Sequence, residues 1–308
     1  MRPGGNSQIM NLELFDRIKV GNTLGEGVIW DHRTETIWWT DIQESRLYHY
    51  NPSSKKLGHY DTPERLCSFG FTDDEKWFIA AFENGFAKYN PEKNILKWLS
   101  KPLEYHNQIR FNDGRVDRQG RFWSGTMVED NNGGDARGRL YRLDLAEKKL
   151  AVPLLEDILI SNSLCWSPDS KKMYFADSTN NRIDVYDFDA ALGIPTNDNT
   201  FAITNEDIFP DGSTIDQEGY LWNAQWGGSR VVRYAPNGEI DYILEVPVSQ
   251  PTCVAFGGPD LSWLFVTTAK DGLDDNQLAN EEFAGDLQIY KTDTKGIPEN
   301  IIKMRNVK

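Results

Sequence analysis

A repeated unit is the sequence feature that most constrains this chain. A turn followed by an apolar couplet recurs six times, with 40 to 52 residues between successive copies. The couplets end at Trp39, Ile79, Trp123, Phe175, Trp222 and Phe265. A period of roughly 40–50 residues with several short strands per unit is typical of a β-propeller. We therefore predict an all-β fold, a six-bladed β-propeller with four-stranded antiparallel blades around a central channel.

A second register supports this assignment. In five of the six units a strand-like segment carries an apolar residue and then a tyrosine three positions later. These tyrosines are Tyr50, Tyr89, Tyr186, Tyr234 and Tyr290. Turns rich in Asp and Gly separate the apolar runs, as expected between the strands of a hairpin. Helical signals are weak, and we expect residues 276–283 to belong to a long loop rather than to a short helix.

The ends of the chain bear on domain organisation. We predict that residues 1–10 are a flexible N-terminus or a non-native addition and that residues 11–308 form one six-bladed domain. Residues 11–15 are expected to complete the last blade, against residues 286–290 or the tail at 300–302, because a propeller closes by borrowing a strand from the other terminus.

Composition excludes several classes of function. The net charge of −14 argues against a nucleic-acid partner and against anionic membrane surfaces. The first ten residues lack the apolar core of a secretory leader, and no run of 18 apolar residues is present, so we expect no membrane span. The three cysteines are far apart in the sequence and form no CxxC motif, which predicts a cytoplasmic protein without disulfides.

The six predicted innermost strands share a polar position. Aligned on the apolar residue before each turn, they place these residues at equal height around the axis: Glu26, Cys67, Asn112, Asn162, Asp211 and Thr252. Two carboxylates and two carboxamides thus share one ring. Buried carboxylates repel each other unless a cation or proton intervenes, and oxygen ligands suit Ca²⁺, Mg²⁺ or Mn²⁺ and are accepted by Zn²⁺.

A simpler interpretation is that each polar residue lines a wet channel. Three oxygen-bearing residues, Glu26, Asn162 and Asp211, are nevertheless each followed by Gly or Ser, which lets the backbone approach the axis. This pattern favours a divalent metal with positions left open for water and substrate, as Lewis-acid hydrolysis needs. Cys67 is expected to be a small buried filler, and the four histidines show no ligand spacing.

The same residues carry a family resemblance. The chain resembles the regucalcin (senescence marker protein)/gluconolactonase family of six-bladed propellers. The matching stretches lie in units one to five at residues 24–30, 110–114, 120–127, 161–169 and 210–212. One departure is Ser161-Asn162-Ser163, where the family usually has Pro-Asn-Gly. The metal ligand is kept there, but the shape of the pocket is expected to differ.

The resemblance implies roles for individual residues. Glu26, Asn162 and Asp211 match the residues that bind a divalent metal in the family. Asn112 and Arg110 match residues that contact substrate. Glu129 and Asp130 match acidic residues that help bind sugar hydroxyls. Asp211 is also expected to accept a proton from the attacking water.

The implied activity is hydrolysis of a sugar lactone to the aldonic acid, as in gluconolactonase, L-arabinonolactonase or xylonolactonase. The resemblance leaves open which lactone is used, its ring size, the oligomeric state, and whether the cation is Ca²⁺, Zn²⁺, Mn²⁺, Mg²⁺ or Fe²⁺. Two alternatives are a metal-dependent phosphotriesterase-like hydrolase and a calcium-binding propeller without catalysis. Polar pocket residues favour a hydroxylated substrate over a phosphotriester, and polar loop tips argue against a binding platform.

Overall fold

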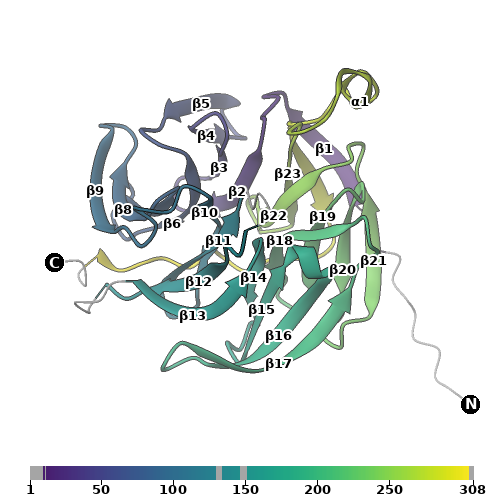
Figure 1. The fold of residues 1–308 in the computed structure, drawn as a ribbon. Helices are drawn as coiled ribbons and strands as arrows, with labels where there is room; N and C mark the ends of the chain where they lie inside the picture. The colour runs from purple at the N-terminus through teal and green to yellow at the C-terminus, as the bar shows by residue number, and fades with distance from the viewer. Residues whose placement is uncertain (1–9, 11, 130–133, 146–150, 305–308) are drawn as a thin grey trace, which may run out of the picture.

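Six four-stranded antiparallel sheets surround a central axis in the computed structural model, which describes residues 10, 12–129, 134–145 and 151–304 (Figure 1). The predicted six-bladed propeller is confirmed, and all six predicted innermost strands take that place. Of the segment at residues 1–10, only Met10 lies within the described residues.

Each blade runs from an innermost to an outermost strand. Blade one holds β2 (Gly25–Asp31), β3 (Thr36–Asp41), β4 (Arg46–Asn51) and β5 (Lys56–Asp61). Blade two holds β6 (Leu66–Phe71), β7 (Phe78–Phe82), β8 (Phe86–Asn90) and β9 (Ile95–Ser100). Blade three holds β10 (Ile109–Val116), β11 (Phe122–Val128), β12 (Gly138–Leu143) and β13 (Ala151–Ile158).

The remaining blades repeat the order. Blade four holds β14 (Ser161–Trp166), β15 (Lys172–Asp177), β16 (Arg182–Asp189) and β17 (Ile194–Ile203). Blade five holds β18 (Phe209–Ile215), β19 (Leu221–Trp226), β20 (Arg230–Tyr234) and β21 (Ile240–Glu245). Blade six holds β22 (Pro251–Gly257), β23 (Trp263–Thr268), β24 (Leu287–Thr292) and, outermost, β1 (Leu12–Ile18).

The two ends of the chain close the ring. Strand β1 pairs antiparallel with β24, from Leu12 opposite Thr292 to Ile18 opposite Leu287, as the first of the two predicted pairings required. The first strand of the chain therefore completes the last blade. This pairing covers the β24 edge that would otherwise lie exposed.

The C-terminal segment crosses the end of the channel at which the innermost strands β6 and β10 finish. Asn300 donates a side-chain hydrogen bond to the Val116 carbonyl at 3.0 Å, and Ile302 forms a parallel bridge with Thr72. Glu299 forms an ion pair with the buried Arg115 at 2.9 Å. The segment, yellow in Figure 1, thus contacts several blades at one end of the axis and leaves the other end for a site.

Buried aspartates build the turns after the innermost strands. Asp117 accepts hydrogen bonds from the Gln119 and Arg121 backbone N–H groups and from the Trp123 indole at 2.9 Å. Blade five repeats the arrangement with Asp216 and Trp222. One carboxylate therefore satisfies the turn and anchors the fully buried tryptophan of the next strand.

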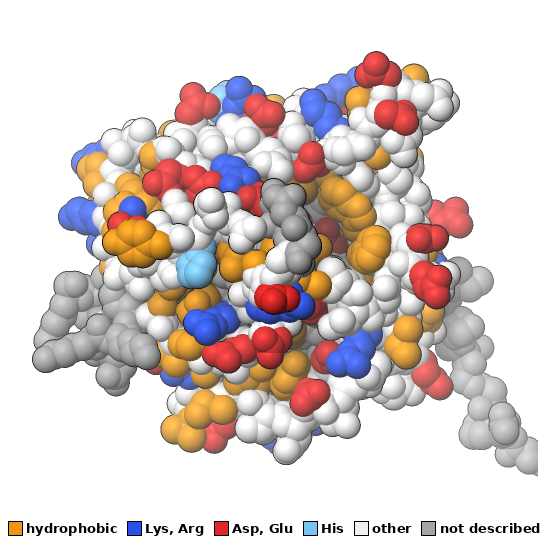
Figure 2. All heavy atoms as spheres, viewed as in Figure 1, with side chains coloured by type: hydrophobic (Ala, Val, Ile, Leu, Met, Phe, Trp, Pro, Cys, Tyr) orange, Lys and Arg blue, Asp and Glu red, His pale blue; other side chains and the backbone are white. Residues whose placement is uncertain are grey.

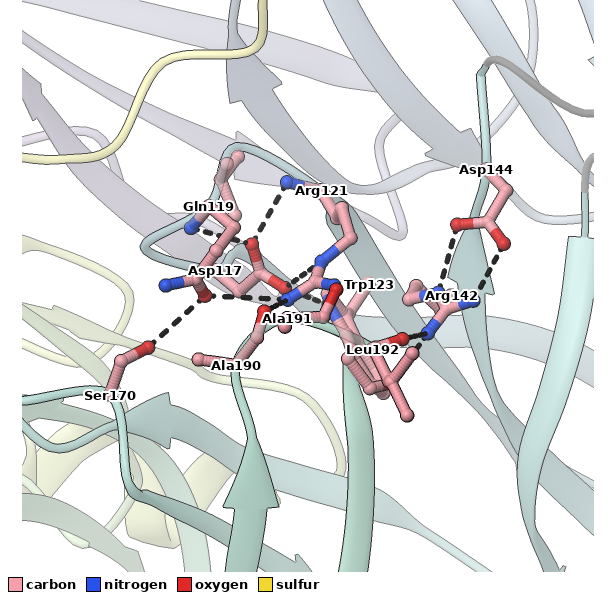
Figure 3. A network of polar contacts seen from close by, with 12 residues as sticks. Asp117, Gln119, Arg121, Trp123, Arg142, Asp144, Ser170, Ala190, Ala191 and Leu192 are labelled. Atoms are coloured by element: carbon pink, nitrogen blue, oxygen red, sulfur yellow. Dashed lines mark hydrogen bonds and ion pairs between the residues drawn. The ribbon is translucent and has the colours of Figure 1, made fainter.

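Arginines from blade three reach across to blade four (Figure 3). Arg121 pairs with Asp117 at 2.7 Å and donates to the Ala190 carbonyl at 2.8 Å. Arg142 pairs with Asp144 and donates to the Leu192 carbonyl, both at 2.6 Å. These contacts fix the loop after β16 against the neighbouring blade.

The prediction of a loop in place of a helix at residues 276–283 is wrong for part of that stretch. A short helix, α1 (Asp275–Asn280), begins after Asp274, whose side chain accepts from the Gln277 backbone N–H at 2.8 Å. The Gln277 side chain accepts in return from the Asp274 backbone N–H, which completes a capping box. The Asp-x-x-Gln spacing was the signal that the sequence offered for this helix.

Two further expectations can be compared with the structure. Cys67, Cys165 and Cys253 are all buried and none is in a disulfide. In the part of the chain that the structure describes, no helix is both long and apolar enough to cross a membrane.

Replacing Asp117 with Ala should lower the free energy of unfolding by about 3 kcal/mol, because Arg121 and the Trp123 indole would lose a fully buried acceptor. Asp144→Ala is the matched control, since it removes the more exposed carboxylate beside Arg142 and should cost no more than about 1 kcal/mol. Urea unfolding of both variants measures the difference. Equal losses would contradict the role given to burial.

Candidate metal and substrate site

A break in strand register recurs at the same level in all six blades. Each innermost strand shifts register against its neighbour near its first residues, for example between Glu26 and Ile29 in β2 and between Asn162 and Cys165 in β14. Bulges of this kind bend a strand and re-aim side chains. The shifts coincide with the polar ring predicted from the sequence.

The residues that follow the three predicted metal ligands are small for different reasons. Gly27 has a φ of 61° and Ser163 a φ of 62°, both in the left-handed region. At Gly212, an added Cβ would lie 2.6 Å from the Cys253 sulfur. Ser163 stands where relatives in the resembled family usually have glycine, so its backbone carries a strain of about 1 kcal/mol.

The ring brings the predicted ligands together at one end of the channel. Glu26, Asn162 and Asp211 are all buried and line one cavity of about 420 Å³, together with Arg110 and Asn112. They come from β2, β14, β18 and β10, which belong to four different blades. The propeller thus assembles residues that lie up to 185 positions apart in the sequence.

The two carboxylates of the ring are close enough for each to affect the pKa of the other. Burial, followed by the charge of Asp113, raises the pKa of Glu26 to about 8. Burial and the charge of Glu26 raise the pKa of Asp211 well above its usual range. Without a cation, the pair therefore retains a proton near neutral pH.

The donor set fits a hard divalent cation. The buried Asp211 Oδ1 atom has no hydrogen-bond partner within the described residues. Two carboxylates and the Asn162 carboxamide supply the oxygen ligands that such ions prefer. Among the described residues no cluster of three or more His, Cys, Asp or Glu side chains that could hold a metal is present.

A chain of hydrogen bonds runs behind the ring. Arg110 donates to the Asn112 Oδ1 atom at 2.8 Å. Asn112 then donates through Nδ2 to the Ser161 carbonyl at 2.9 Å and to the Asn162 Oδ1 atom at 3.3 Å. The two predicted substrate residues are therefore held against a predicted metal ligand.

Glu129 lies at the rim, bound by two arginines. Its carboxylate accepts from Arg65 at 2.7 and 2.9 Å and from Arg110 at 2.8 Å. Hydrogen bonds from Arg65 and Arg110 help to lower the pKa of Glu129, against the opposing effect of burial. Glu129 is thus placed to hold Arg110. Asp130, predicted with it, lies outside the described residues.

Part of the cavity wall is apolar. Met127, Ile160, Phe209 and Trp226 line it together with the polar ring, and Asp271 is a further acidic residue of the lining. Figure 2 shows this face of the molecule, with hydrophobic side chains gathered beside a hollow near its centre. A ligand in this hollow would meet polar groups at its base and apolar surface along one side.

Several residues of the site were not predicted from the sequence. Ser178, Asp271 and Arg65 lie in connections outside the aligned innermost strands. The residues of the apolar wall follow no sequence pattern that distinguishes them from core residues. One equivalence was readable: Asp177 ends β15 as Asp41 ends β3, so Ser178 and Ile42 hold the same place in their blades. Of the two, Ser178 lines the cavity. Burial raises the pKa of Cys67 to about 11, as suits a packed side chain rather than a nucleophile.

Comparison with known proteins places the chain in a family. Residues 24–270 match the family described as the SMP-30/Gluconolactonase/LRE-like region. The chain belongs to this family. The resemblance seen in the sequence is thereby confirmed.

Relatives match this chain over nearly its whole length. L-arabinolactonase of Azospirillum brasilense is 38% identical, and the match covers 90% of this chain and 91% of the length of that protein. 6-Deoxy-6-sulfogluconolactonase of Pseudomonas putida is 32% identical, and the match covers 94% of this chain and 98% of the length of that protein. The crystal structure of a calcium-binding protein, regucalcin, from Agrobacterium tumefaciens superposes with a TM-score of 0.86 and 31% identity, covering 94% of this chain and 97% of its own.

The raised pKa of Glu26 predicts how the metal-free protein responds to pH. An acid whose pKa is higher when folded adds stability that is full below its unfolded value of about 4.5 and is lost as pH rises to about 8. Melting temperatures of the metal-free protein should therefore fall as the pH is raised from about 5 to 9. The neutral Glu26→Gln variant should show a shallower fall, and equal slopes would contradict the assignment.

Proposed function

We propose that this protein is a metal-dependent lactonase that hydrolyses a sugar lactone to the aldonic acid. The observation that carries the proposal is the ring of Glu26, Asn162 and Asp211, with its unpartnered Asp211 oxygen, at the base of a cavity lined also by Arg110 and Asn112. The arrangement combines a cation site with hydrogen-bonding groups for a hydroxylated molecule.

The relatives support the same reaction. Two of the proteins that match nearly the full chain carry the names of sugar lactonases, and a structural neighbour is described as calcium-binding. A cavity of about 420 Å³ has room for a single sugar lactone. The neutral, buried thiols suit a reducing compartment, so we place the protein in the cytoplasm.

Glu26, Asn162 and Asp211 would hold the cation. A bound divalent ion supplies Lewis-acid polarisation of the lactone carbonyl and charge stabilisation as negative charge develops on its oxygen. Any of Ca²⁺, Mg²⁺, Mn²⁺, Zn²⁺ or Fe²⁺ is compatible with oxygen donors of this kind.

Asp211 is the proposed general base. Asp211 would help to hold the cation and would also accept a proton from the water that attacks the carbonyl carbon. The ring C–O bond then breaks, and the same carboxyl group returns its proton to the ring oxygen that leaves. Water is consumed, and one carboxylic acid and one hydroxyl group are formed.

Arg110 and Asn112 orient the substrate. Arg110 lines the cavity, and Glu129 pairs with its guanidinium at 2.8 Å. We propose that Glu129, and Asp130 beyond the described residues, hold sugar hydroxyls at the rim, either directly or by fixing Arg110. The apolar wall with Phe209 and Trp226 would contact the C–H face of the sugar ring.

A panel assay tests the function. Chelator-stripped protein would be given each cation in turn, with five- and six-membered aldonolactones, and acid release followed with a pH indicator. Turnover that depends on added metal is expected. Hydrolysis of a phosphotriester instead, or metal binding without any turnover by folded protein, would favour the phosphotriesterase or the calcium-binding alternative.

Asp211→Ala should lower kcat by at least about 100-fold, because the variant loses both a ligand and the base. The exposed Asp207→Asn, on the same blade, is the matched control and should keep full activity. Circular dichroism would establish that both variants fold. Full turnover by a folded Asp211→Ala protein would overturn the mechanism.

A further inference from the structure

We propose that Ser178 is a positioning residue that sets which atom of Asn162 faces the cation and ties this ligand to the backbone beside Asp211. The proposal rests on the metal site described above and goes beyond its ligands. Ser178 begins the short 3₁₀ helix η1 (Ser178–Asn180), which follows β15, and its side chain is buried at the cavity.

The direction of the hydrogen bonds follows from the single hydroxyl proton. Ser178 Oγ lies 2.7 Å from the Pro210 carbonyl oxygen, which can only accept, so the hydroxyl donates there. Its oxygen is then an acceptor for the Asn162 Nδ2 group at 2.9 Å. The carboxamide nitrogen is thereby drawn away from the ring, and Oδ1 is left for the cation.

The other end of the chain imposes the same orientation. A guanidinium can only donate, so Arg110 fixes Oδ1 of Asn112 as the acceptor and turns its Nδ2 group toward Asn162. Asn162 Oδ1 receives that donor at 3.3 Å. Reversing the Asn162 carboxamide would set two N–H groups against each other and direct another at the cation.

Ser178 is itself rigidly held. Its backbone N–H donates to the Ile160 carbonyl at 2.9 Å. The preceding Asp177 accepts from the Leu159 and Ile160 backbone N–H groups at 2.9 and 3.0 Å. The hydroxyl therefore has a fixed origin, close to the start of β14.

Blade one shows that the turn does not need a serine. Asp41 accepts from the Thr23 and Leu24 backbone N–H groups just as Asp177 does in blade four. The residue after it is Ile42, which packs in the core. Ser178 is therefore explained by its contacts with Asn162 and Pro210 rather than by the turn. Because Pro210 directly precedes Asp211, one hydroxyl links two ligands of the site.

Calorimetric titration of the metal-free full chain with Mn²⁺ tests the proposal. Ser178→Ala should raise the dissociation constant for Mn²⁺ by about tenfold. This is the lower end of the effect expected for a residue that orients a metal ligand. In an Asn162→Ala background, Ser178→Ala should have a smaller effect, because the carboxamide that it orients is gone. Ser178→Thr, which keeps the hydroxyl, should restore most of the affinity.

Ser68→Ala is the matched control. Ser68 is a buried serine bonded to Ser124 at 2.9 Å, and neither hydroxyl touches a predicted ligand, so Mn²⁺ affinity should not change. Unchanged affinity in Ser178→Ala would overturn the proposal, as would an equal effect in the Asn162→Ala background. If Ser178→Ala fails to fold, Ser178→Cys replaces it in the same Mn²⁺ titrations. Cysteine has a similar volume, but its thiol is a weaker hydrogen-bond donor.

Binding and turnover separate this proposal from the proposed function. Tight Mn²⁺ binding that depends on Ser178 without lactone hydrolysis would support the positioning role and overturn the lactonase. Lactone hydrolysis together with an Mn²⁺ affinity that does not depend on Ser178 would support the lactonase and overturn the positioning role. No Mn²⁺ binding by the unsubstituted chain would overturn both the metal site and the role of Ser178.

Discussion

Closure of the ring by β1 and β24 is the constraint on which the rest of the structure depends. Each blade is a twisted sheet whose faces are buried only by the blades on either side, so a chain of six blades leaves two faces exposed unless the first meets the last. The pairing of Leu12–Ile18 with the Leu287–Thr292 strand fixes blade six and brings it against blade one. The innermost strands then stand at fixed angles around one axis, and residues from three blades can share one cation.

The site is built at a cost to local structure. A register shift at the same level of every innermost strand gives up ladder hydrogen bonds, and Ser163 holds a left-handed backbone conformation. Two carboxylates, Glu26 and Asp211, are buried together with raised pKa values. These unfavourable features meet at one place in a fold that is otherwise regular, which is typical of a functional site whose surroundings over-determine its geometry.

The hydrogen bonds along the channel wall all run in one direction, from donor to acceptor. From Arg110 through Asn112, Asn162 and Ser178 to the Pro210 carbonyl, each group donates to the next one along the channel wall. An isolated carboxamide can adopt two orientations that exchange its oxygen and nitrogen. A network whose donors all point the same way allows only one of them. The wall therefore presents oxygen rather than nitrogen to the cavity before any ligand arrives.

The sequence by itself determined the number of blades, the innermost strands and the ring of Glu26, Asn112, Asn162 and Asp211. Each of these depends on a repeat, and a repeat is readable because equivalent positions in successive blades meet the same surroundings. The short helix α1 was missed because six residues give little periodic signal, although its capping box was present. Only the tertiary structure decided which hydrogen-bond partners meet across blades. Arg65 and Ser178 lie in connections outside the aligned innermost strands. Their contacts, Arg65 with Glu129 and Ser178 with Asn162 and Pro210, depend on how neighbouring blades pack.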